Sequence, residues 1–308
     1  MSTYLHEHST PEQLTSLISS LSQDDPQFCD RPENQALLIA SRYVLDGSWH
    51  ATQLRFFSIH EDGASRHVVI VEESEQQMTH IYIRHDVLHP DLTLLHRGLF
   101  QLFSLLRPSF DKHQKFLIEC EEEISRMCIL LASWESFAVN TSRSLRAFYM
   151  KNEQMLQLSK MEIGLPEGFS FASIDVEREG QFLFDTWSAK AESTIEIMKS
   201  RVRDLPSIGI RNEAGELVAW EFLSPYCGKF IHLWTQPAYR GLGLGTAVEM
   251  RLAQILVERG MRVLKNVRVD NVRVLEGTEK HALWSCWMKN DTEPLPWSVT
   301  HFRSYVKE

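Results

Sequence analysis

The spacing of apolar residues changes several times along the first half of the chain, as expected where helices and strands alternate. After a Thr-Pro start, Leu14, Leu17 and Leu21 recur at helical spacing. A leucine-rich helical pattern over 93–106 is expected to end before Pro108, because proline disfavours helix in the residue before it. The other patterned segments are apolar runs at 36–40, 54–59, 68–71, 81–83 and 115–120 and a helical pattern at 121–134. This mixture predicts an α/β arrangement for the first half.

The second half has clearer boundaries between its elements. A turn-forming cluster at 212–215 separates two apolar runs, 207–211 and 217–223, which predicts a β-hairpin. A strand over 229–235 leads through a glycine-rich loop into an amphipathic helix that is expected to end at Gly260. The remaining predictions are strands at 169–174 and 263–269 and helices at 177–187 and 193–202.

Between residues 136 and 165 the apolar periodicity is irregular, and a Gly-Leu-Pro-Glu-Gly sequence closes that stretch. We therefore predict two domains, an N-terminal α/β domain over 1–155 and a second domain over 166–308. The 308 residues are enough for two cores of roughly 150 residues each.

Composition and charge exclude several classes of function. The chain has 32 basic and 41 acidic residues, a net charge of −9, which disfavours a general nucleic-acid binder. No stretch approaches the roughly 18–20 apolar residues that span a bilayer. The five cysteines are scattered without CxxC spacing, so neither disulfides nor a metal site is predicted. The N-terminal segment lacks the basic start of a signal peptide and the arginines of a transit peptide, which predicts a cytoplasmic protein.

The sequence Arg-Gly-Leu-Gly-Leu-Gly-Thr lies between the predicted strand at 229–235 and the amphipathic helix. A helix N-terminus leaves backbone N–H groups unpaired and carries partial positive charge. Residues without Cβ let a diphosphate approach these groups closely. The loop is therefore predicted to bind a diphosphate through Arg240, Gly241, Leu242, Gly243, Leu244, Gly245 and Thr246. The alternative is a plain glycine-rich turn.

Two other phosphate-binding loops do not fit this sequence. The dinucleotide fingerprint requires Gly or Ala three residues after the second glycine, where this chain has Thr246. A Walker A loop requires a lysine directly after the glycines, and none is present.

The Arg-x-x-Gly-x-Gly pattern after a strand and a Pro-x-Tyr segment resembles the pyrophosphate motif of the GNAT acyltransferase superfamily. The run Val-Ala-Trp-Glu-Phe, the Pro-Ala-Tyr-Arg segment and the long first half are similar to the glycine N-acyltransferase-like family. The resemblance implies a C-terminal GNAT fold, with a central mixed sheet flanked by helices, and a GNAT-like N-terminal half. It implies acyl-CoA as co-substrate, with no permanently bound cofactor, and a mitochondrial location in place of the cytoplasm. By resemblance Asn271 contacts the CoA arm.

The implied activity is transfer of an acyl group from acyl-CoA to glycine or another small amine, by direct attack in a ternary complex. The backbone of Leu233, Trp234 and Thr235 is expected to line the pantetheine arm, with the indole of Trp234 either in the acyl channel or in the core. Arg262, Lys265, Arg268 and Arg273 either attract the CoA 3′-phosphate or form a solvated face.

The proton carriers depart from the family pattern. Where the family has a catalytic glutamate, eleven residues before the motif arginine, this chain has Lys229. His232, with a suitable intrinsic pKa, and Glu221, on the preceding strand, are the candidate substitutes. Residues 271–288 contain no tyrosine to protonate the thiolate, so no acid is assigned. Two alternatives stay open: a protein or polyamine acetyltransferase, and a catalytically degenerate acyl-CoA-binding protein. The oligomeric state stays open too.

Overall fold

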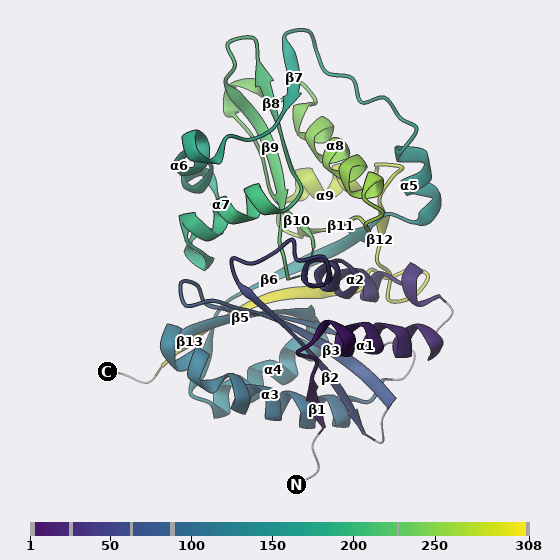
Figure 1. Cartoon of the computed structure of the whole chain (residues 1–308), viewed down its shortest axis with the longest axis vertical. Helices are drawn as coiled ribbons and strands as arrows, with labels where there is room; N and C mark the ends of the chain where they lie inside the picture. Colours follow the sequence, from purple (N-terminus) through teal and green to yellow (C-terminus); the bar gives the residue numbers. More distant parts are fainter. Residues whose placement is uncertain (1–3, 25–26, 62–63, 87–89, 227, 306–308) are drawn as a thin grey trace.

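The computed structural model describes residues 4–24, 27–61, 64–86, 90–226 and 228–305. Within them, most strands follow a single 13-stranded sheet in the order β1-β2-β3-β4-β5-β13-β6-β11-β10-β9-β8-β7, and β12 pairs with β6 (Figure 1). The strands are β1 (Leu5–Glu7), β2 (Gln53–Glu61), β3 (Ala64–Glu73), β4 (Thr79–Arg84), β5 (Lys115–Glu121), β6 (Phe137–Tyr149), β7 (Phe169–Ala172), β8 (Ser207–Asn212), β9 (Leu217–Leu223), β10 (Phe230–Thr235), β11 (Leu264–Arg268), β12 (Ser285–Cys286) and β13 (Trp297–Ser304).

Helices cover both faces of this sheet. They are α1 (Pro11–Asp24), α2 (Pro32–Leu45), α3 (Leu92–His113), α4 (Glu122–Trp134), α5 (Asn152–Leu158), α6 (Val176–Thr186), α7 (Ile195–Asp204), α8 (Leu244–Glu258) and α9 (Val272–Glu279). In the C-terminal half, α6 and α7 lie on one side of strands β8 to β10 and α8 on the other (Figure 1). The predicted mixed α/β class, with a central mixed sheet flanked by helices, is confirmed.

The two halves of the chain share strands. β13, from the C-terminal end, lies between β5 and β6 and pairs with both of them in antiparallel register. β6 in turn pairs with β11 of the second half. The predicted boundary between 155 and 166 begins in the last turn of α5 and continues into a segment without helix or strand. The division into two domains stays a prediction, and any such domains are joined through β6 and β13.

Several elements differ from those predicted. Helix α3 continues through Pro108 to His113, because Phe110 packs in the core and stacks on Phe116 with ring centroids 4.0 Å apart. That packing outweighs the backbone hydrogen bond that a proline inside a helix gives up. The apolar run at 36–40 lies in helix α2. The stretch at 136–165 contains β6 and α5, whose polar positions obscured the pattern.

Candidate functional site

Strands β10 and β11 run parallel and separate from one another. Their register contains a single pair within the described residues, Phe230 with Lys265. On the other side of β10, the register with β9 shifts between Ile231 and Trp234, which marks a β-bulge. His232 lies in this bulge with φ of 56°, a value that is uncommon outside glycine. Because the two strands pair at one end and then diverge, a space opens between them toward the glycine loop.

The glycine loop follows β10 and leads directly into α8. Gly241 and Gly243 have φ of 86° and 80°, so both use the conformational freedom of glycine, and Gly243 is the N-cap of α8. A Cβ built on either residue would meet nothing within 4 Å. The loop is therefore open on this side, with the first turn of α8 behind it.

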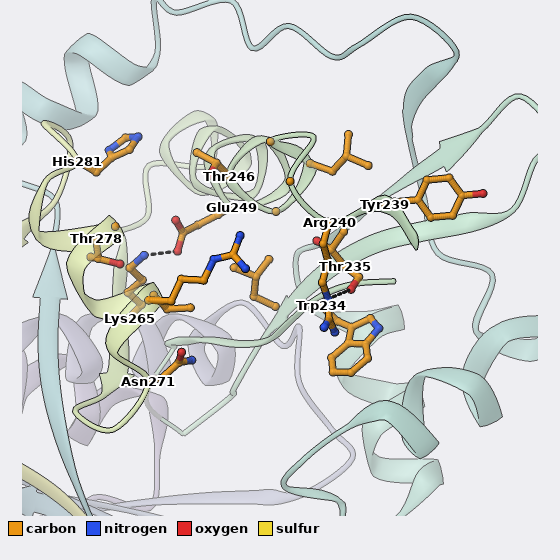
Figure 2. Close-up of a pocket in the computed structure, with 18 of the residues that line it drawn as sticks. Trp234, Thr235, Tyr239, Arg240, Thr246, Glu249, Lys265, Asn271, Thr278 and His281 are labelled. Carbon is orange, nitrogen blue, oxygen red and sulfur yellow. Dashed lines mark hydrogen bonds and ion pairs between the residues drawn. The ribbon is translucent and has the colours of Figure 1, made fainter. Parts of the chain in front are cut away.

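Arg240 is exposed and held beside the loop. Its Nε donates to the carbonyl oxygen of Thr235 at 3.1 Å, and its guanidinium lies 5.0 Å from the ring centroid of Trp234 (Figure 2). These two contacts leave the other guanidinium N–H groups of Arg240 without a hydrogen-bond partner among the described residues, and anion binding by Arg240 stays a prediction.

A cleft of about 660 Å³ opens between the loop, β10, β11 and α9. It brings together residues that are far apart in the sequence, because α9 lies across from the N-terminus of α8 (Figure 2). Leu242 is not among the lining residues. The predicted CoA-binding residues that line it are Leu233, Trp234, Thr235, Arg240, Gly241, Gly243, Leu244, Gly245, Thr246 and Asn271.

The four basic residues near β11 have different surroundings. Arg273 and Lys265 line the cleft, and the Lys265 ammonium is buried in an ion pair with Glu249. Arg268 instead pairs with Asp270, and Arg262 with Asp30 of the first half. Arg273 is thus the member of this group that combines a place in the cleft with an exposed position.

Lys229, at the position where the family pattern has glutamate, is a core residue. Its ammonium contacts the carboxylate of Glu119 on β5 and lies 5.0 Å from the ring centroids of Tyr82 and Trp297. The hydroxyl of Tyr226 and the indole N–H of Trp297 donate to the same carboxylate at 3.0 and 3.1 Å. Lys229 is therefore part of a buried polar cluster between the two halves.

The two predicted proton carriers lie beside the cleft rather than in its lining. His232 is partly buried, with its imidazole stacked on Trp220 and Phe222 and its Nε2 at 3.4 Å from the hydroxyl of Thr186. Burial lowers the pKa of His232 to about 3, so its imidazole is neutral at pH 7. Glu221 is 2% exposed, and burial raises its pKa well above 4.5. Their catalytic roles stay predictions.

Sequence reasoning missed the polar residues on the floor of the cleft. Glu249 was not singled out, and Lys265 was grouped with the other basic residues near 262–273. In the structure both are buried and paired with one another (Figure 2). The available signal was the glutamate next to Val248, inside an otherwise apolar first half of α8. His281 and Trp284, after α9, also line the cleft and were not predicted to bind CoA.

Two kinds of feature are absent from the described part of the chain, a cluster of metal-ligating side chains and a membrane-spanning helix. That part of the chain contains no group of three or more His, Cys, Asp or Glu side chains placed to hold a metal ion. None of its helices has both the length and the apolar character needed to cross a bilayer.

Comparison with known proteins agrees with this geometry. The family model described as "FR47-like protein" matches residues 207–276, which include the hairpin, the loop and α8. No curated protein matches the sequence.

Three solved structures are similar over nearly the whole chain. A Drosophila protein is 14% identical with a TM-score of 0.77, covering 97% of this chain and 98% of its own. A tandem GNAT protein from the clavulanic acid biosynthesis pathway is 11% identical with a TM-score of 0.56, covering 99% of both chains. A Pyrococcus horikoshii protein described as a putative acetyltransferase is 11% identical with a TM-score of 0.56, covering 100% of this chain and 92% of its own. The chain thus has a tandem GNAT-like fold.

Proposed function

We propose that this chain is an N-acyltransferase of the glycine N-acyltransferase-like type, which moves an acyl group from acyl-CoA to glycine or another small amine. One observation carries the proposal: the loop is open at Gly241 and Gly243 toward a cleft at the N-terminus of α8. The GNAT fold supports acyl-CoA-dependent acyl transfer in general terms. The Val-Ala-Trp-Glu-Phe and Pro-Ala-Tyr-Arg segments support the finer assignment.

In this proposal the loop binds the CoA diphosphate. Its oxygens accept hydrogen bonds from the main-chain N–H groups of residues 241–246, where the helix dipole favours negative charge. Arg240 adds a guanidinium at the rim, and Asn271 and Arg273 lie across the cleft for the rest of the CoA molecule. The neutral or apolar side chains of Leu244 and Thr246 add no repulsive charge.

The acyl transfer would take place along the free edge of β10. Since β10 separates from β11 after Phe230, backbone groups of Leu233–Thr235 face the cleft without a partner strand on that side. They can hold the pantetheine arm and the thioester oxygen, whose negative charge grows as the amine attacks. His232 is the candidate acceptor for the proton of the amine, because its side chain is less buried than that of Glu221; the burial that lowers its pKa also makes it a weaker base than an exposed histidine.

One assay distinguishes the proposed function from the two alternatives, a protein or polyamine acetyltransferase and a catalytically degenerate acyl-CoA-binding protein. Release of thiol is followed with acetyl-, benzoyl- and longer acyl-CoAs against glycine, other amino acids, polyamines and a lysine peptide. Turnover with amino acids supports the proposal. Turnover with cationic acceptors alone would instead favour the protein or polyamine acetyltransferase. Binding of CoA without turnover would favour the catalytically degenerate protein, which agrees with Lys229 at the position of the family's catalytic glutamate.

The loop itself is tested with Gly243→Asp in a calorimetric titration with CoA. We expect a loss of affinity of at least about 100-fold, because a carboxylate and a Cβ enter the diphosphate site. Gly215→Asp is the matched control, since Gly215 has φ of 76° and open surroundings but lies in the β8–β9 hairpin. Equal CoA affinity of Gly243→Asp and the control would overturn the proposed function.

A further inference from the structure

The floor of the cleft carries a buried ion pair. Glu249 lies one helical turn after Gly245, about 6 Å along α8. Lys265 is the β11 residue that pairs with Phe230, so it marks the closed end of the space between β10 and β11. The Lys265 ammonium contacts the Glu249 carboxylate and lies 4.4 Å from the ring centroid of Trp284 (Figure 2). A charged pair is thus held on the floor of the cleft, about one helical turn beyond the diphosphate loop.

A second carboxyl group lies behind this pair. Glu221 of β9 is 2% exposed, and its Oε2 has no hydrogen-bond partner within the described residues. Its burial and the negative charge of Glu249 raise its pKa, while Lys265 acts in the opposite direction with a smaller effect. The buried site therefore combines the Lys265–Glu249 ion pair with a neighbouring carboxyl group whose pKa is raised by burial.

The proposed reaction needs a proton donor at this end of the cleft. The amine nitrogen forms a bond to the thioester carbon, the carbon–sulfur bond breaks, and the electron pair leaves with sulfur as the CoA thiolate. The thiolate then takes up one proton to give free CoA, while the amine has lost one. A lysine ammonium suits this step, because the ordinary pKa values of lysine and a thiol, about 10.4 and 8.5, are close.

Two other cleft residues with exchangeable protons are less well placed. Tyr239 precedes the diphosphate loop, and its hydroxyl accepts a hydrogen bond from Asn212 at 2.9 Å. His281 accepts a hydrogen bond at Nδ1 from the Leu283 N–H, and its ring lies apart from the Lys265–Glu249 pair (Figure 2). Neither contacts the buried pair in the described structure.

We propose that Lys265 gives its proton to the departing CoA sulfur, that Glu249 holds the ammonium in place, and that Glu221 is a positioning residue next to this pair. This assignment rests on the proposed acyl transfer. It differs from the sequence prediction for Glu221, which made that residue a proton acceptor, because Lys265 and Glu249 line the cleft and Glu221 does not.

The experiment measures CoA affinity, kcat and the pH dependence of kcat on the full chain. In the wild type we expect kcat to fall at high pH as the lysine loses its proton. Lys265→Met is expected to lose at least about 100-fold in kcat and to lack that fall, with CoA affinity within threefold. Lys265→Arg keeps the charge but holds its proton too firmly, so it should bind CoA and stay equally slow. Glu221→Gln should move the pH of the fall without changing CoA affinity.

Three controls make the outcome decisive. Lys280→Met removes an exposed lysine that pairs with Glu276, and His281→Gln removes the imidazole that lines the cleft. In both variants kcat should still fall at high pH. If Lys265→Met does not fold, Lys265→Met/Glu249→Gln removes both charges and is measured instead. If the wild type is active and both Lys265 variants keep its kcat, the assignment of Lys265 is overturned, while the proposed function stands. The same holds if kcat of His281→Gln no longer falls at high pH. A wild type that binds no CoA overturns the proposed function itself.

Discussion

His232 shows how one residue combines backbone strain with a shifted pKa. Its φ of 56° places it in the bulge of β10, and its imidazole lies against Trp220, Phe222 and Trp187. Residues with a strained backbone cluster at functional sites, and they persist only where the surrounding packing holds them in place. The bulge also brings its side chain to the face of the sheet that β-strand alternation would deny it.

We expect His232→Asn to lower kcat by about 100-fold if the imidazole accepts the proton of the amine. Asparagine tolerates positive φ, so the bulge should persist and CoA affinity should stay within threefold.

The same residue also makes stability depend on pH. The pKa of His232 in the folded protein, about 3, lies below the ordinary 6.5, so the stability linked to this neutral imidazole is complete above pH 6.5. It is lost as the pH falls from 6.5 toward 3, and the variant should lose less stability over that range. Urea unfolding at several pH values and steady-state kinetics measure both effects; an unchanged kcat would leave His232 a structural residue.

At the scale of elements, local signals predicted the part of the chain that carries the site. Turn residues at 212–215, the glycine loop and the apolar face of α8 are each contained in a short stretch of sequence, and each element was found within a few residues of its prediction. The exposed side of β6 and the continuation of α3 past Pro108 depend on distant partners. β6 is held by β13, which lies about 150 residues later, and no local pattern could indicate that pairing. For the same reason the pair of Glu249 with Lys265 was not predicted.

Helix α9 offers a test of how the cleft wall is built. Gly277 lies in this helix and lines the cleft, and a Cβ there would meet nothing within 4 Å. Gly277→Ala should raise the free energy of unfolding by about 0.5–1 kcal/mol, because glycine is the poorer helix former. The added methyl group enters the cleft, so CoA should bind several-fold more weakly. Gly260→Ala, at φ of 65° after α8, is the contrasting control and should destabilise the protein. Loss of stability in Gly277→Ala would contradict the helical surroundings described for it.

At the scale of the whole molecule, the two halves are joined by more than shared strands. Arg201 of α7 reaches Glu72 of β3, with 3.2 Å between Nη2 and Oε1, and both side chains are buried. Lys229 and Glu119 form a second contact of this kind. Burial of Glu72 acts to raise its pKa, but Arg201 and His80 outweigh it and lower the pKa to about 2. Stability from this carboxylate is therefore complete above pH 4.5 and is lost as the pH falls from 4.5 toward 2.

Arg201→Met tests whether this buried contact holds the C-terminal half against the first half. The substitution leaves the Glu72 carboxylate buried without its main partner, and breaking such a pair costs about 3–5 kcal/mol. Arg203→Met is the matched control, two residues further along α7, where the guanidinium is half exposed and pairs with Glu177 on the surface. Its cost should stay within about 0.5 kcal/mol, because exposed pairs contribute little. Urea unfolding at pH 7 measures the stability of both variants.

At pH 3 the difference in stability between the two variants should shrink, because part of the Glu72 contribution is already lost in the parent protein. Equal stability of the two variants at pH 7 would mean that the shared strands β6 and β13 hold the halves together without help from the ion pair.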